Sequence, residues 1–208
     1  MSLLSRLFGS KSGSGDGPSD LEGRLRALEE EAARARPGYQ GTPLNKAGDL
    51  ALRAGRRAQA VEFYGRAIDA FLEDQQREAA RGVANKIIRV HPKAVRTLCT
   101  LTWLDLAARH KATALLHLRD YVEAAHEIGE DARAQGQILE MARFSPQLEF
   151  VDAVADALDG LGFDERAAEV REWVREGGSP DALTDTEKLE ERCLRAAVDS
   201  SRRGGKGR

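Results

Sequence analysis

The sequence predicts an all-α fold built from stacked helical hairpins, and three observations support this prediction. Of the 208 residues, 41% are apolar and 32% are charged, which is enough apolar material for a core and too much for a disordered chain. Strong helix formers dominate, whereas aromatic residues make up only 5% and β-branched residues are scarce. Between Gly and Pro breaks, apolar residues recur at steps of three and four, as in amphipathic helices. We expect these helices to be antiparallel neighbours in an extended superhelix with flexible termini.

The chain divides into four stretches. Residues 1–19 contain an apolar tip followed by a Gly/Ser linker, and this linker is expected to behave as flexible coil. Residues 20–177 form a long helical domain. A Gly-Gly-Ser-Pro break then introduces a C-terminal helix within residues 178–200, and residues 201–208 form a basic tail that we expect to be disordered.

Ten helices are expected, and the short connections between them favour antiparallel packing. Their approximate spans are 20–36, 42–55, 57–72, 77–90, 92–110, 112–128, 131–143, 145–160 or 145–162, 164–176 and 184–200. Ser19 with Glu22, and Thr184 with Glu187, form capping boxes for the first and the last helix. Thr42 is expected to cap the second helix. The first and last helices are richer in charge, which would suit capping or peripheral positions in the stack.

Small and aromatic side chains recur at fixed intervals. Ala60, Tyr64 and Ala67 step by four and three, and they follow Gly48 and Gly55. Two further sets, 34 residues apart, repeat this step: Ala80, Ala84 and Ile87, then Ala114, Leu118 and Tyr121. The pattern resembles the tetratricopeptide repeat (TPR) family, whose 34-residue helix–turn–helix unit carries a small, an aromatic and another small residue on its second helix. The resemblance implies a TPR-like α-α superhelix over residues 42–175.

The phase of the repeat is open in one region. Ala60 and Ala80 are 20 residues apart rather than 34, so the helix at 57–72 could be the second helix of one hairpin or the first of the next. Both assignments remain available over residues 61–85.

The resemblance also implies a concave groove that binds a partner. Trp103 corresponds to a position that often faces the concave surface in TPR-like repeats, and Arg96 and Cys99 would share its face. Asn45 and Asp49 are the corresponding positions in the first unit. The carboxylate clamp of chaperone-binding members is not implied, because Asp49 replaces its neutral amide and would repel a carboxylate ligand. Trp103 has a second interpretation, as a core residue that fills a hairpin interior.

The motifs do not indicate catalysis or metal binding. None of the four histidines is paired at the i, i+4 spacing of a helical zinc site, and His117 is expected to be a partly buried helix residue. The segment Gly9-Ser-Lys-Ser-Gly lacks the GxxxxGK[ST] spacing of a phosphate loop, and no GxSxG motif occurs. We therefore expect no enzyme, no metal site and no cofactor.

An acidic helix face has two interpretations. Asp152, Asp156 and Asp159 lie at steps of four and three, so they share one side of the helix at 145–160. This face is either a solvated surface or an acidic patch for a basic peptide.

The N-terminal tip also has two interpretations. Its large apolar residues are Leu3, Leu4, Leu7 and Phe8. With Arg6 and Lys11 nearby, the tip is either a disordered end or a small docking motif with at most marginal membrane affinity.

These observations favour a scaffold that binds a peptide or helix of a partner protein. The alternative is a peripheral membrane adapter that is weakly anchored by residues 2–8. The net charge of −2 disfavours a third function, RNA binding, so no nucleic-acid partner is expected. Two cysteines without metal spacing, the lack of a secretory signal pattern and the lack of an apolar run of about 18 residues favour a cytoplasmic setting. The sequence indicates no particular oligomeric state.

Overall fold

The computed structural model describes residues 18–202, and every regular element within them is an α-helix. The helices are α1 (Pro18–Arg34), α2 (Gly41–Arg53), α3 (Arg57–Glu73), α4 (Arg77–Val90), α5 (Val95–Ala107), α6 (Lys111–Glu127), α7 (Asp131–Phe144), α8 (Leu148–Gly160), α9 (Asp164–Glu176) and α10 (Thr186–Arg202). The expected all-α fold is therefore confirmed for this part of the chain. Among these ten helices, none is long and apolar enough to cross a bilayer.

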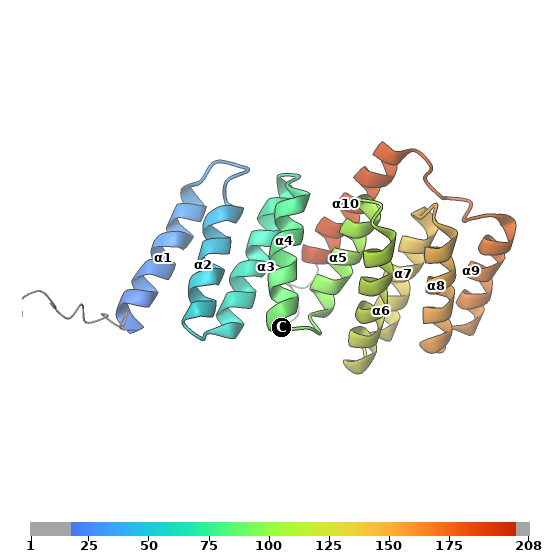
Figure 1. Cartoon of the computed structure of the whole chain (residues 1–208), viewed down its shortest axis with the longest axis horizontal. Helices are drawn as coiled ribbons and strands as arrows, with labels where there is room; N and C mark the ends of the chain where they lie inside the picture. The colour runs from blue at the N-terminus through green and yellow to red at the C-terminus, as the bar shows by residue number, and fades with distance from the viewer. Residues whose placement is uncertain (1–17, 203–208) are drawn as a thin grey trace, which may run out of the picture.

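The helices stand side by side in one long row. Figure 1 shows α1 at one end of this row and α9 at the other, with each helix antiparallel to the next. After α9 the chain turns back, and α10 packs against α5 and α3 instead of extending the row. The first helix, α1, lies at one end of the row, whereas α10 lies on the face of helices in its middle and caps neither end.

Alternate helices of the row form two layers. In one layer, Lys86 of α4 reaches two side chains of α2, and α6 contacts α8. In the other layer, α5 is bonded to α3 through Arg96 and to α7 through Trp103. Because α10 packs on α3 and α5, it covers the layer of odd-numbered helices and leaves the even-numbered layer uncovered.

The repeated small and aromatic residues form the core between neighbouring helices. All nine positions of the three repeated sets are buried, with 2% exposure or less. The approach of α2 to α3 depends on Gly48, because a Cβ atom there would lie 2.4 Å from the ring of Tyr64. Trp103 and Phe150, both fully buried, continue this core along the row.

Three of the expected helix starts are wrong. Thr42 lies inside α2, which begins at Gly41 without a side-chain cap. The helices expected after Pro92 and Ser145 begin later, at Val95 and Leu148. The residue before a proline is disfavoured in the helical region, and His91 and Ser145 are both non-helical, so these two helices start after a short turn.

The last helix is capped by a different residue from the one expected. Asp185, rather than Thr184, accepts the backbone N–H groups of Glu187 (3.0 Å) and Lys188 (3.3 Å). A carboxylate caps at least as well as a hydroxyl and also interacts favourably with the positive end of the helix dipole. The first helix, α1, begins at Pro18, two residues before the expected start, and the predicted box of Ser19 and Glu22 stays a prediction because the Ser19 side chain lies outside the described residues.

Candidate functional site

Two of the five predicted groove residues lie in the even-numbered layer. Lys86 Nζ of α4 donates to Asn45 Oδ1 (2.9 Å) and Asp49 Oδ1 (2.6 Å) of α2. The hydroxyl of Tyr64 donates to the same Asp49 oxygen at 2.7 Å. Burial raises the pKa of Asp49, but the bonds from Lys86 and Tyr64 outweigh it and hold this pKa below its ordinary value. Asn45 and Asp49 therefore serve contacts within the protein.

The other three predicted residues lie on α5, in the odd-numbered layer. Arg96 Nη2 pairs with both carboxylate oxygens of Asp69 on α3, at 2.7 and 2.9 Å. Trp103 has no exposed surface, and its Nε1 donates to Gln137 Oε1 of α7 at 3.1 Å. Cys99 lies 3.5 Å from the same oxygen, and burial raises the pKa of its thiol to about 12. Trp103 thus occupies the core, which was the second of its two interpretations.

The structure does not bring the five predicted residues together on one open surface. Asn45 and Asp49 bond to α4, whereas Arg96, Cys99 and Trp103 face α3 and α7. The α5 side of this layer is also covered, because α10 packs on it.

Apolar side chains and a few polar contacts hold α10 against the odd-numbered layer. Its buried apolar residues are Leu189, Cys193, Ala196 and Ala197. Near its C-terminal end, Ser200 Oγ lies 3.0 Å from Thr100 Oγ1 of α5 in a buried hydrogen bond. Arg192 pairs with Glu140 of α7 and lies 4.4 Å from the centroid of the Phe144 ring. These contacts fix α10 across three helices of the odd-numbered layer.

A buried carboxylate joins α4, α5 and α6. Asp105 of α5 has no exposed surface, and it lies 3.0 Å from Arg81 Nη2 and 2.7 Å from His117 Nδ1. The side chain of His117 is 14% exposed, so its predicted place as a partly buried helix residue is confirmed. Because the carboxylate is enclosed by its own partners, this cluster holds helices together. Among the described residues, no group of three His, Cys, Asp or Glu side chains is placed to hold a metal ion.

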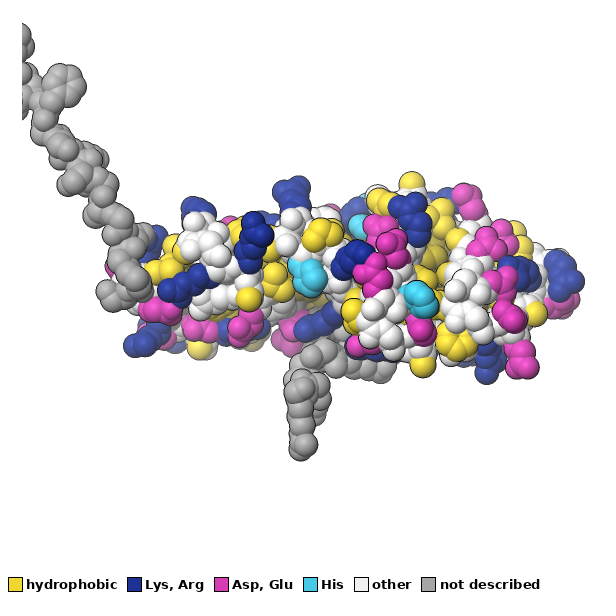
Figure 2. Space-filling view, turned by 90° about the horizontal axis from the view of Figure 1, so that it is seen from below, with side chains coloured by type: hydrophobic (Ala, Val, Ile, Leu, Met, Phe, Trp, Pro, Cys, Tyr) yellow, Lys and Arg dark blue, Asp and Glu magenta, His cyan; other side chains and the backbone are white. Residues whose placement is uncertain are grey.

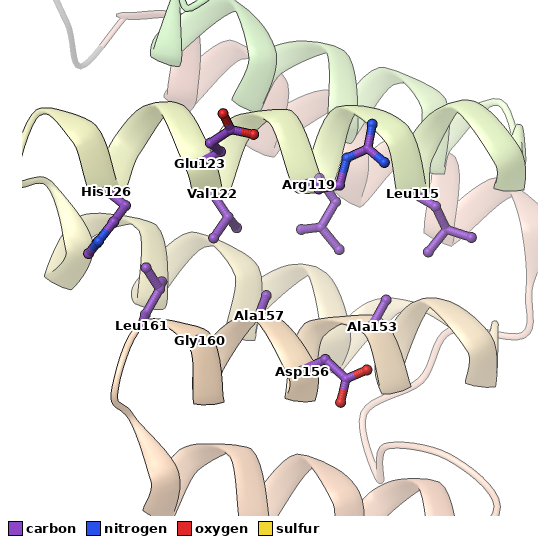
Figure 3. A pocket seen from close by; sticks show the side chains of 11 residues that line it. Leu115, Arg119, Val122, Glu123, His126, Ala153, Asp156, Ala157, Gly160 and Leu161 are labelled. Carbon is purple, nitrogen blue, oxygen red and sulfur yellow. The ribbon is translucent and has the colours of Figure 1, made fainter.

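An open groove of about 510 Å³ lies between α6 and α8 in the uncovered layer. Its floor is apolar, and its apolar lining residues are Leu115, Leu118, Val122, Ala153, Ala157 and Leu161. Figure 3 shows Leu115 and Val122 of α6 pointing toward Ala153 and Ala157 of α8, while Arg119 turns its charged end away from the floor. Three of the four α8 residues that line the groove are small, namely Ala153, Ala157 and Gly160, and they leave space opposite the larger side chains of α6.

Charged side chains surround this groove. Its charged or titratable lining residues are Arg119, Glu123, His126 and Asp156. Lys111 of α6 pairs with Glu149 of α8, so this ion pair links the first turns of the two helices. The predicted acidic face is present, with Asp152, Asp156 and Asp159 all exposed, although the last two pair with Arg171. The two aspartates raise the pKa of the Arg171 guanidinium, which therefore keeps its charge.

The end of the molecule that contains the groove is acidic. Residues 111–176 include fifteen Asp and Glu but only seven Lys and Arg, which gives this stretch a formal charge of −8. Residues 20–95 include fourteen Lys and Arg and eleven Asp and Glu, which gives this stretch a formal charge of +3. Figure 2 shows acidic side chains at both ends of this face of the row, several of them over the end formed by α6–α9. The small net charge of the whole chain therefore hides a marked asymmetry along the row.

Sequence reasoning missed the α6–α8 groove. The available signal was the run of small residues at Ala153, Ala157 and Gly160, at steps of four and three on one helix face. The predicted membrane-contacting segment, residues 2–8, lies outside the described residues.

Comparison with family models, with curated proteins and with solved structures finds no match to this chain.

Proposed function

We propose that the protein is an interaction scaffold that holds an apolar peptide or amphipathic helix of a partner protein in the α6–α8 groove. The observation that carries the proposal is the groove itself, an apolar channel of about 510 Å³ with a charged rim in the layer that α10 leaves uncovered. Apolar grooves between helices are a common way to bind amphipathic helices.

The proposal includes a TPR-like arrangement of the hairpins. Its support is the burial of the three repeated sets and the alternation of helices between two layers. In such stacks one hairpin cannot cover its own apolar faces, so neighbours build a continuous core and leave an extended surface for ligands. Here the ligand surface we propose is the even-numbered layer, since α10 already fills the odd-numbered one.

Large apolar side chains of the ligand would enter the space left by the small residues of α8. Each such side chain that becomes fully buried contributes about 1.5–3 kcal/mol, and association costs about 4–15 kcal/mol. Two or three anchors supply about 3–9 kcal/mol, which is of the same order as that cost, so we expect binding to be weak. The charged rim would orient the ligand and raise its association rate.

Selection of displayed peptides against the full chain tests the proposal. We expect selected peptides to carry two or three large apolar residues and to lose at least tenfold in affinity for Ala157→Trp, which fills the groove. The matched control is Ala168→Trp, because Ala168 is exposed on α9 outside the groove lining. Peptides that bind both variants as well as the wild type would refute this site.

A further inference from the structure

We propose that the occupant of the α6–α8 groove is the N-terminal segment of a second copy of this protein, residues 2–8. The inference rests on the proposed function of the groove and names its partner. Three observations carry it: the apolar character of the segment and of the groove, their opposite charges, and the distance along the row between the groove and α1, which follows the segment in the chain.

The first observation is apolar complementarity. The segment carries four large apolar side chains among seven residues, at positions 3, 4, 7 and 8. This spacing would put all four on one side of a helix. The groove offers the matching surface, because Ala153, Ala157 and Gly160 leave room for large side chains opposite Leu115 and Val122.

The second observation is charge complementarity. The first eleven residues contain two basic side chains, Arg6 and Lys11, and no acidic one. The end of the molecule around the groove carries a formal charge of −8 between residues 111 and 176. Opposite potentials of this kind favour association and disfavour wrong partners. The C-terminal tail at 203–208 is also basic, but it contains no apolar side chain that could enter the groove.

The third observation explains why the segment comes from a second copy. Residues 2–8 precede α1, and Figure 1 shows α1 at the opposite end of the row from α8. The nine residues at 9–17 span at most roughly 30 Å when fully extended. Holding a linker at full extension costs conformational entropy, so donation between copies is favoured over return within one chain. The resulting contact is head-to-tail.

Binding of a labelled peptide to the full chain is the direct test. The probe is a fluorescent peptide of residues 1–17, followed by anisotropy. We expect saturable binding that weakens at least tenfold for the Ala157→Trp protein and is unchanged for the Ala168→Trp protein. A peptide with Leu7→Ser and Phe8→Ser should bind at least tenfold more weakly. A peptide with Arg6→Glu and Lys11→Glu should also bind more weakly, and the salt dependence of the parent peptide should be lost.

Self-association of the full chain is the second readout. Sedimentation should show an average mass that rises with concentration, and the combined Leu7→Ser and Phe8→Ser change in the full chain should abolish this rise. A full chain that stays monomeric at all concentrations would overturn donation by a second copy. Equal peptide binding to wild type and Ala157→Trp would overturn the site.

Two further outcomes separate the remaining explanations. If the peptide does not bind but the full chain pellets with phosphatidylserine vesicles through Leu7 and Phe8, the segment contacts lipid and the inference is wrong. If the peptide does not bind but display selection still yields groove ligands, only this inference fails and the proposed function stands. Failure of both experiments would remove both proposals.

Discussion

At the residue scale, the fold depends on small side chains where neighbouring helices meet. Gly48 of α2 lies against the ring of Tyr64 of α3, and there is no room between them for a methyl group. The close approach also brings the Tyr64 hydroxyl to Asp49 at 2.7 Å. One glycine thus permits both the apolar contact and the polar bond that joins the two helices.

Replacing this glycine should destabilise the protein. We expect Gly48→Ala to lower the free energy of unfolding by about 1–3 kcal/mol, because its Cβ would overlap the Tyr64 ring. Gly65→Ala is the matched control, since no atom lies within 4 Å of its Cβ position, and it should raise stability by about 0.5–1 kcal/mol. Urea unfolding followed by circular dichroism measures both, and equal effects would contradict this role of Gly48.

The buried carboxylate of Asp105 leads to a second prediction. Asp105→Ala should lower the free energy of unfolding by about 3–5 kcal/mol, because it leaves Arg81 without its buried partner. Asp199→Ala, at an exposed position on α10, should change it by less than about 0.5 kcal/mol. The same urea experiment measures both changes. A loss of less than about 1 kcal/mol for Asp105→Ala would contradict the prediction and would mean that water replaces the carboxylate.

The ion pair of Asp49 leads to a pH prediction. The folded protein holds the pKa of Asp49 below its ordinary value of 3.8, so the carboxylate stabilises the fold above that pH and less as the pH falls through the folded pKa. The stability lost in Asp49→Asn should therefore be larger at pH 7 than at pH 3. Urea unfolding curves of the wild type and of Asp49→Asn at pH 7 and pH 3 measure this loss of stability. A loss that is larger at pH 3 than at pH 7 would contradict the prediction.

At the element scale, the sequence predicted the bounds of the helices better than it predicted which helices pack against one another. The spans expected at 77–90 and 164–176 agree with α4 and α9, because Gly, Pro and polar turns mark their ends clearly. The return of α10 could not be predicted. Its buried stripe at Leu189, Cys193 and Ala197 shows that one face is covered, but periodicity does not say which helices cover it.

The thiol of Cys193 should report the docking of α10. Burial raises its pKa to about 12, so labelling of the folded protein at pH 8 should be slow. Arg192→Met removes the pair with Glu140 and the contact with the Phe144 ring, so it should speed labelling several-fold. Arg195→Met, which removes only an exposed pair with Glu191, should leave the rate unchanged. Mass spectrometry distinguishes Cys193 from Cys99, and equal rates would contradict this anchoring role.

At the scale of the whole molecule, the sequence predicted a row of helices but not which surface stays open. The candidate residues were assigned to one face by analogy between repeat units, yet Asn45 and Trp103 lie in different layers. Contacts across about a hundred residues, such as Thr100 with Ser200, decide which layer is covered.

The open layer and the charge asymmetry together define the central claim, that ligands bind between α6 and α8. Hydrogen exchange of the full chain with and without a selected peptide tests this claim most directly. We predict added protection in α6 and α8 and no change in α3 or α5. Protection confined to α3, α5 and α10, or spread evenly along the row, would contradict it.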